Sequence, residues 1–504
     1  MGRFFREQAV AVDTRASRRA PPGTRAVVVG GGLAGVAAAT VLAERGVEVT
    51  LVEREPFLGG RAGAWGDTLA TGEPFEMERG FHAFFRQYYN VRALLRRLDP
   101  SLSMLRPLED YPILGPDGEA LSFSGLPRRT PFNLIGLLAG ARVVGLRDLA
   151  RMSPRAASAM LAFDMEPTFR RFDGTTARDY LISLGLPERA RRLLFDVFAH
   201  SFFNPEERMS AAELLMMFHF YFLGNPEGLV FDVLREPFRT ALFRPLGQCL
   251  EGLGARVVPG RSATRVDVSA GGGGRGGARR FRVELDDGRA LDADGVVLAL
   301  SVPGLRAVVG ASPGLGEVAF RRSVERLSVT LPFVVLRLWL DRPCAAGRAP
   351  FAGTTGRGPL DNISLYHLFE GESERWARRT GGAVVELHAY AVPRPVDEEA
   401  VCAALIEGLH AFYPETRTAR ILERRVLVRE DCPAFETGSF EDRPGVESAG
   451  SGLGVAGDFV RVPFPTALME RAVSSGFLAA NHLLRGWGTQ GTELWSVPRK
   501  GVLA

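Results

Sequence analysis

The chain has 504 residues, of which 46% are apolar and 24% are charged, and its formal net charge is +4. This length exceeds what one hydrophobic core usually holds, so we expect more than one domain, and the composition excludes a largely disordered protein. Residues 1–25 contain six arginines and two acids, which accounts for the whole net charge, so nucleic-acid binding by the rest of the chain is not indicated.

The N-terminal segment, residues 1–24, is basic and has neither the apolar core nor the small-residue cleavage site of a secretory signal. We predict a disordered tail, with contact to anionic lipid headgroups as an alternative. The sequence contains no run of about 18 apolar residues, so we do not expect a membrane-spanning helix. The four cysteines (Cys249, Cys344, Cys402 and Cys432) form no CxxC pair, so we expect neither a disulfide framework nor a metal site, and a reducing cytoplasm fits.

Residues 25–53 predict a strand, a glycine-rich turn, a helix and a second strand. Gly30, Gly32 and Gly35 occupy the three glycine positions of G-x-G-x-x-G directly after the apolar run 26–29. The first glycine permits a tight turn, the second lets the backbone approach a pyrophosphate, and the third lets the helix pack closely on the strand. Leu33 and Ala34 would then begin the helix, whose free N–H groups attract phosphate.

Glu53 ends the second predicted strand, 23 residues after Gly30. An acid about 20 residues after the turn commonly binds the ribose hydroxyls of a dinucleotide. A second match to the glycine pattern at residues 452–457 leads into Asp458 and is not followed by a helix start, so we do not interpret it as a second such site. The first unit therefore predicts dinucleotide binding.

The next segment, "REPFLGGRAGAW", indicates which dinucleotide. Gly59, Gly60 and Arg61 resemble the G-G-R that follows the first βαβ unit in flavin-dependent amine oxidases and carotene desaturases. The resemblance implies FAD, with the glycines passing close to its phosphates, Arg61 neutralising their charge, and Arg54 also at the cofactor.

The aromatic segment "FEMERGFHAFFRQYYN", residues 75–90, follows. Phe81, Phe84, Phe85 and Tyr88 have the spacing i, i+3, i+4, i+7, which predicts a helix with an apolar stripe. His82, Arg86 and Tyr89 would lie on its other face, and Glu76 and Glu78 just before it. The segment is similar to one that descends beside the flavin in ζ-carotene desaturases.

Two further apolar segments suit a lipid substrate. "PFNLIGLLAGARVVGL", residues 131–146, fits a helix that is either buried or lies in a membrane interface. "LLMMFHFYFLG", residues 214–224, fits either a core helix or the wall of a polyene pocket, in which Phe218 and Tyr221 would contact the substrate.

Later segments complete the cofactor domain in this resemblance. Strands on both sides of the glycine-rich residues 270–277 return the chain to the cofactor, with the main chain at Ala263 meeting the adenine. Gly457 and Asp458 would bind the ribityl chain. The helix that follows, beginning near Ala467 and Leu468, would point its N-terminus at the flavin ring.

Several long segments, among them "EMERGFHAFFRQYYN" and "VVELHAYAV" (384–392), are similar to bacterial isorenieratene synthases over most of residues 25–485. These enzymes desaturate the β-ring of a carotenoid and shift one methyl group, which gives an aromatic end group. The resemblance implies non-covalent FAD, a carotenoid substrate and no methyl donor. It requires a base, for which we predict Glu78 before His82, and aromatic walls that stabilise a cation: Phe84, Phe85, Tyr88, Tyr89, Phe218 and Tyr221.

The resemblance implies an α/β fold: a Rossmann-like FAD-binding domain of the glutathione-reductase/amine-oxidase type with an inserted mixed α+β substrate domain. We expect the FAD-binding domain at residues 25–100, 241–305 and 426–490, the substrate domain at 101–240 and 306–425, and a C-terminal tail at 491–504.

Three alternatives stay open: another FAD-dependent carotene desaturase or isomerase, an amine oxidase, and a prenyl-lipid chaperone on the same fold. We expect a cytoplasmic protein associated peripherally with the membrane surface, whose electron acceptor is a quinone or oxygen.

Overall fold

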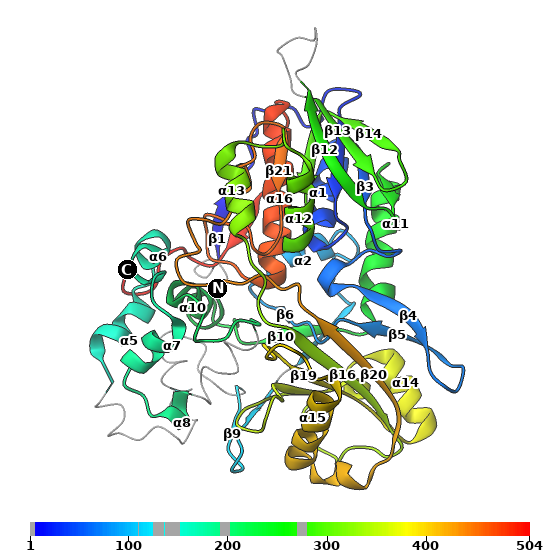
Figure 1. Cartoon of the computed structure of the whole chain (residues 1–504), viewed down its shortest axis with the longest axis vertical. Coiled ribbons are helices and arrows are strands. Elements are labelled where there is room, and N and C mark those ends of the chain that lie inside the picture. Colours follow the sequence, from blue (N-terminus) through cyan, green and yellow to red (C-terminus); the bar gives the residue numbers. More distant parts are fainter. Residues whose placement is uncertain (1–5, 109, 124–135, 137–151, 192–201, 270–279) are drawn as a thin grey trace.

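The structure is a computed structural model that describes residues 6–108, 110–123, 136, 152–191, 202–269 and 280–504. Figure 1 shows two lobes, one built on a parallel sheet and the other on a largely antiparallel sheet. The apolar segment 131–146, apart from residue 136, and the glycine-rich residues 270–277 lie outside the described residues.

The parallel sheet joins parts of the chain that are far apart in sequence. Its five described strands have the order β11-β3-β2-β15-β21. Their bounds are β2 (Arg25–Val29), β3 (Glu48–Val52), β11 (Arg256–Val258), β15 (Gly295–Leu298) and β21 (Leu453–Val455). The strands come from each of the three segments expected to form the FAD-binding domain, whose domain boundaries stay predictions.

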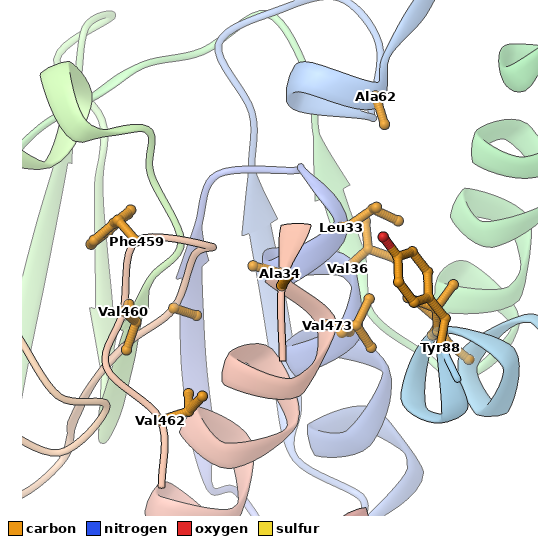
Figure 2. Packing of buried hydrophobic residues seen from close by; sticks show 14 of the residues in the cluster. Leu33, Ala34, Val36, Ala62, Tyr88, Phe459, Val460, Val462 and Val473 are labelled. Carbon is orange, nitrogen blue, oxygen red and sulfur yellow. The ribbon is translucent and has the colours of Figure 1, made fainter. Parts of the chain in front are cut away.

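Two helices, α1 (Leu33–Glu44) and α16 (Leu468–Gly486), pack against each other beside this sheet. Figure 2 shows Ala34 and Val36 of α1 close to Val473 of α16. Further elements of this lobe are α2 (Tyr89–Leu95), α11 (Arg244–Gly252), α12 (Val302–Ala311), α13 (Val318–Arg326), and the antiparallel strands β12 (Ala263–Ser269), β13 (Arg280–Leu285) and β14 (Ala290–Ala293).

The second lobe contains a sheet of seven described strands in the order β20-β16-β19-β18-β17-β8-β9. Their bounds are β8 (Ile113–Leu114), β9 (Ala120–Leu121), β16 (Phe333–Leu340), β17 (Phe351–Thr354), β18 (Asn362–Leu365), β19 (Ala383–Ala389) and β20 (Ile421–Arg429). Residues alternate between the two faces of a strand. One face, with Leu336 and Leu387, packs under α15 (Glu398–Phe412), whereas Val335 on the other face belongs to the core shared with the first lobe.

Shorter elements connect the lobes and form a helical region. The strands are β4 (Ala64–Thr68), β5 (Pro74–Glu78), β6 (Phe84–Phe85), β7 (Leu105–Leu108) and β10 (Phe231–Leu234). The helices are α5 (Pro154–Leu161), α6 (Met165–Phe172), α7 (Ala177–Ser183), α8 (Glu188–Arg191), α10 (Ala211–Phe218) and α14 (Gly371–Thr380), with π-helical turns at His219–Leu223 and Arg239–Phe243. No helix among the described residues is long and apolar enough to cross a membrane.

The prediction that residues 1–24 form a disordered tail is wrong for residues 6–24, which the structure describes. Strand β1 (Glu7–Val10) pairs antiparallel with β22 (Leu494–Ser496), so residues near the two ends of the chain form one two-stranded sheet. The Arg6 guanidinium lies over the Trp495 ring at 3.9 Å from its centroid, which adds a cation–π contact.

The prediction of a helix over Phe81–Tyr88 is also wrong. Phe84 and Phe85 form the short strand β6, which pairs with β10, and the helix α2 begins only at Tyr89. Arg86 and Arg92 both form ion pairs with Asp232 of β10, which fixes this segment against a strand about 140 residues away. Pairing with a distant segment has overridden the local helical spacing.

Candidate active site

A large cavity lies between the two lobes. Its volume is about 780 Å³, within the range of roughly 300–1,000 Å³ that is usual for ligand sites. Glycine-rich loops and charged side chains from the parallel-sheet lobe line one end, and aromatic rings line the other.

The loop after β2 presents backbone to the cavity, which Gly30, Gly32, Leu33 and Ala34 all line. Helix α1 begins at Leu33, and Gly32 at its N-cap offers no side chain to bind the first N–H groups. A β-carbon on Gly35 would lie 1.8 Å from the carbonyl oxygen of Gly30, so glycine is what lets α1 begin directly against the turn. The result is an uncapped helix end that can bind a phosphate.

Glu53 is buried beside this helix end. Its Oε2 accepts a hydrogen bond from the N–H of Gly31 at 2.6 Å, and its Oε1 accepts one from the N–H of Glu55 at 2.9 Å. Burial raises the pKa of the Glu53 carboxyl above its usual value. Arg54 and Ala263 line the same end of the cavity, so these residues could hold a nucleoside.

The predicted G-G-R segment, residues 59–61, passes close to the glycine-rich turn at residues 30–35. Gly59 and Gly60 have φ angles of +132° and +56°, and a β-carbon on Gly60 would lie 3.1 Å from the Cα of Gly32. Arg61 follows and forms an ion pair with Asp458, in which one of the two contacts measures 2.8 Å. Both charged side chains line the cavity, where the pair joins the first and last parts of the cofactor lobe.

The N-terminus of α16 opens on the same cavity. Leu468 begins this helix with a φ of +48°, a left-handed conformation that is uncommon for leucine. Leu468 and Gly457 line the cavity, whereas Ala467, the preceding N-cap residue, is buried and does not. No side chain caps the helix, so its positive end can stabilise negative charge on a bound ring.

Together these groups fit a flavin adenine dinucleotide. The uncapped α1 terminus suits a pyrophosphate, Glu53 suits a ribose, and the α16 terminus suits a ring system that gains negative charge on reduction. Gly32 provides the test of fit, because a β-carbon there would meet no atom of the described residues closer than 3.7 Å. The described part of the chain therefore leaves room for another group beside Gly32.

The other end of the cavity is aromatic. Phe81 stacks on Phe351 with 4.4 Å between ring centroids, and Phe85 meets Phe231 edge-on at 5.2 Å. Phe333 lines the same region. Such walls suit an extended apolar molecule.

Three of the six predicted pocket residues line the cavity: Phe85, Tyr88 and Tyr221. The hydroxyl groups of Tyr88 and Tyr221 form a hydrogen bond of 2.7 Å, so these two rings are fixed relative to each other.

The structure does not bring the other three, Phe84, Tyr89 and Phe218, to the cavity. Phe84 is fully buried and stacks on Phe238, because neighbouring residues of a strand point to opposite faces. The Tyr89 hydroxyl accepts a hydrogen bond from Asn225, and Phe218 is buried in α10.

Glu78 does not line the large cavity, which argues against the prediction that it is the base. Its Oε1 accepts a hydrogen bond from the N–H of Phe238 at 2.9 Å, and its Oε2 accepts one from the Tyr366 hydroxyl at 3.3 Å. Burial raises the pKa of Glu78 to about 8, so the carboxyl group is largely protonated at neutral pH. A protonated carboxyl group cannot accept the proton of a substrate.

His82 does line the cavity. Its Nδ1 lies 2.7 Å from the carbonyl oxygen of Gly80, so the ring proton resides there and Nε2 carries the free electron pair. Burial lowers the pKa of His82 to about 4, and the ring is neutral. Its role as a base stays a prediction.

Four polar residues of the antiparallel sheet were not singled out from the sequence: Asn362, Glu386, His388 and Tyr390. Asn362, His388 and Tyr390 line the cavity, and Glu386 lies behind His388. The signal was present, because residues 386, 388 and 390 alternate with apolar residues and must share one face of a strand.

Fold and cavity together define a flavin-dependent oxidoreductase. Residues 33–484 match the model of the flavin containing amine oxidoreductases. A carotenoid phi-ring synthase from Streptomyces griseus is 51% identical over 474 residues, which cover 94% of this chain and 90% of the relative. The carotenoid phi-ring synthase of Chlorobaculum tepidum is 29% identical and covers 95% of this chain and 91% of its own length. The chain therefore belongs to the flavin-containing amine oxidoreductase family and, within it, groups with the carotenoid phi-ring synthases.

Solved structures confirm the predicted fold class. Putrescine oxidase bound to putrescine superposes with a TM-score of 0.65 at 15% identity, covering 92% of this chain and 99% of the other. Cyclohexylamine oxidase from Brevibacterium oxydans gives a TM-score of 0.64 at 14% identity, with the same coverage. At this identity the likeness concerns the fold alone.

The glycine turn yields a direct prediction. Gly32→Val should abolish flavin binding while the protein stays folded, because Gly32 lines the cavity, has an ordinary φ of −75°, and could carry a β-carbon 3.7 Å or more from the atoms of the described residues. The ratio of flavin absorbance to protein absorbance measures the binding, and circular dichroism measures the fold. Gly310→Ala is the control, since a β-carbon at Gly310 meets nothing within 4 Å. A Gly32→Val protein with full flavin content would contradict the assignment.

Proposed function

We propose that this protein is a carotenoid phi-ring synthase, which converts the cyclohexene β-ring of a carotenoid into an aromatic end group. Two hydrogen pairs leave each ring, and one geminal methyl group moves to the neighbouring carbon. The observation that carries the proposal is the composition of the cavity: a dinucleotide end and an aromatic, apolar end share one space. The near full-length similarity to carotenoid phi-ring synthases supports the same reaction.

The cofactor and the aromatic walls of the cavity have different roles in the proposed reaction. A bound flavin supplies the two-electron acceptor to which a ring carbon can lose hydride. Gly30, Gly32, Leu33, Ala34, Glu53 and Arg61 line the cavity and would bind and orient that cofactor.

The aromatic walls act on the ring that has lost hydride. Loss of hydride from an allylic carbon leaves a delocalised cation, and aromatic faces within about 6 Å attract such a charge. Phe85, Tyr88 and Tyr221 are the predicted wall residues that line the cavity, and Phe81 and Phe351 add a stacked pair. These faces can stabilise the positive charge while the methyl group migrates.

We propose that the flavin is FAD and that it is bound without a covalent bond. Cys432 lines the cavity, so a thiol is within reach of the cofactor region. However, burial raises the pKa of Cys432 to about 12, and a protonated thiol is a poor nucleophile.

Acid precipitation should therefore release all the flavin into the supernatant, which absorbance of the supernatant and the pellet would measure. Cys432→Ser should bind flavin in the same molar ratio as the unmodified chain. A yellow pellet that loses its colour in Cys432→Ser would overturn the non-covalent proposal.

A membrane surface is the proposed source of the substrate. A carotenoid is almost insoluble in water, so direct transfer from a bilayer avoids an aqueous step, and a cytoplasmic protein at the membrane periphery would suit this transfer. The electrons taken from the substrate would then have to leave the protein, to a quinone in the membrane or to oxygen.

The source of the ring methyl groups tests the proposed reaction. Cells that make β-ring carotenoids and express this chain are fed methionine labelled with ¹³C in its methyl group. Mass spectrometry should find an aromatic carotenoid that lacks two hydrogen pairs per converted ring and carries no ¹³C, because the methyl group migrates within the ring. One labelled methyl group per ring would contradict migration, and absence of any aromatic product would contradict the function. Cells that express Gly32→Val are the control and should keep their β-rings.

A further inference from the structure

The cavity-facing side of the antiparallel sheet carries a line of hydrogen-bonded polar groups. Glu386, His388 and Tyr390 follow one another at alternate positions along β19 and its end, so all three lie on one face. Neighbouring strands supply the flanking groups: Arg337 of β16 is opposite Glu386, and Asn362 of β18 is opposite His388.

The hydrogen bonds run in one direction. His388 Nε2 lies 2.8 Å from Oε1 of Glu386, and His388 Nδ1 lies 2.6 Å from the Tyr390 hydroxyl. The Asn362 amide donates to the same hydroxyl oxygen at 3.0 Å. Because the Tyr390 oxygen already accepts from Asn362, its own proton is free to point at His388.

The charge of Glu386 decides which nitrogen of His388 carries the proton. Burial alone would raise the pKa of the Glu386 carboxyl group. The Arg337 guanidinium, 2.8 Å away, and the His388 ring outweigh this effect and hold the pKa at about 2. The carboxylate is therefore ionised and accepts the Nε2 proton. The N–H of Phe81 also lies near Nε2, but at 3.5 Å this contact is the weaker one. Nδ1 is left with a free electron pair that accepts the Tyr390 proton.

Two members of this line, His388 and Tyr390, line the cavity, and Tyr390 is the more exposed of the two. Glu386 is fully buried, and His388 is 1% exposed, whereas Tyr390 is half-buried and lies beside the aromatic walls. Asn362 also lines the cavity, and its Oδ1 is buried without a hydrogen-bond partner among the described residues. The line of bonds thus leads from the cavity into the interior.

We propose that the Tyr390 hydroxyl accepts the proton that the substrate ring loses, and that His388 and Glu386 are positioning residues that take up the displaced phenol proton. This assignment rests on the proposed function. The arrangement has the logic of a nucleophile–histidine–acid triad, in which a buried carboxylate fixes the histidine tautomer and stabilises the imidazolium. In this protein, the Tyr390 phenol takes the position of the nucleophile, and it removes a carbon-bound proton from the substrate.

After hydride has left and the methyl group has moved, the ring is a cation. A neighbouring C–H bond breaks, its electron pair becomes the new C=C bond, and its proton passes to Tyr390 Oη. The phenol proton passes at the same time to His388 Nδ1, which leaves a neutral tyrosine and an imidazolium beside the Glu386 carboxylate. A carbon acid next to a cation is very strong, so a neutral phenol coupled to an imidazole is sufficient as its base.

The other candidates lack one part of this arrangement. Glu78 does not line the large cavity and is largely protonated. His82 lines it, but the only hydrogen-bond partner of its ring among the described residues is the Gly80 carbonyl oxygen, so no carboxylate is hydrogen-bonded to this ring. Of these three candidates among the described residues, Tyr390 is the one that combines a position in the cavity with a hydrogen-bonded histidine–carboxylate pair.

The test compares the full-length, flavin-loaded protein with Tyr390→Phe, which removes the hydroxyl and keeps the ring. The substrate is a β-ring carotenoid in phospholipid vesicles, with and without deuterium on the ring carbons. Tyr413→Phe is the matched control, because Tyr413 is equally aromatic but packs on the opposite face of the same sheet. His388→Gln and Glu386→Gln probe the two positioning residues.

Tyr390→Phe should bind flavin in the normal ratio and form aromatic rings ~10²–10⁴-fold more slowly, as is usual when a catalytic base is lost. The deuterium isotope effect on product formation should increase, because proton loss becomes the slow step, and a purely structural defect would not change it. His388→Gln should show the same increase, whereas Tyr413→Phe should match the unmodified protein in both rate and isotope effect.

A normal rate in Tyr390→Phe, or a rate that falls only in proportion to lost flavin, would overturn the proposal. A normal rate in Tyr390→Phe combined with a slow His82→Gln would transfer the role to His82. The comparison is separate from the proposed function itself: if the unmodified protein desaturates a polyene without making aromatic rings, the function fails, and the ratio of variant to unmodified rates still decides the role of Tyr390.

Discussion

The close contact between α1 and α16 is the constraint on which the site depends. A β-carbon on Gly476 of α16 would lie 2.2 Å from the carbonyl oxygen of Ala34, so the two helix backbones touch (Figure 2). Leu33 and Leu468, the first residues of the two helices, both line the cavity. One packing contact therefore brings two uncapped helix ends, which begin 435 residues apart in the sequence, to the same space and gives it two positive poles for a cofactor that carries phosphates and gains charge on reduction.

The second lobe supplies the polar groups on the substrate side of the cavity. Its sheet turns an apolar face to α15 and a polar face, with Arg337, Glu386 and His388, toward the cavity. Cross-strand neighbours neutralise the buried charges, which would otherwise be costly in an apolar interior. Aromatic rings line the cavity where the lobes meet, so that in the proposed reaction a cation can form next to these rings and next to the proposed proton acceptor. In the proposed reaction, one lobe therefore carries out the oxidation and the other the proton transfer.

Much of the cofactor site could be predicted from the sequence because its constraints are local. Gly30, Gly32, Gly35 and Glu53 belong to one βαβ unit, whose spacing reflects the geometry of a turn. The substrate side could not be predicted in this way. The spacing of Phe81 to Tyr88 fits a helix, yet pairing with β10 makes Phe84 a core residue and leaves Phe85 in the cavity. Glu78 precedes the aromatic segment in sequence, but whether a carboxyl group faces a cavity or a backbone N–H is decided by distant strands. The alternation of polar and apolar residues at 386–390 can be recognised in the sequence. Its partners Arg337 and Asn362 cannot be identified in this way, because they lie on other strands.

We propose that hydride loss to flavin and aromatisation of a carotenoid ring occur in one cavity of this chain. The electron stoichiometry tests this most directly, under argon, with the purified protein, β-ring carotenoid in vesicles and a water-soluble quinone. The flavin should bleach on addition of the carotenoid alone, and two quinone molecules should be reduced for each aromatic ring formed. Aromatic rings that form while the flavin stays oxidised and the quinone is not consumed would contradict this proposal.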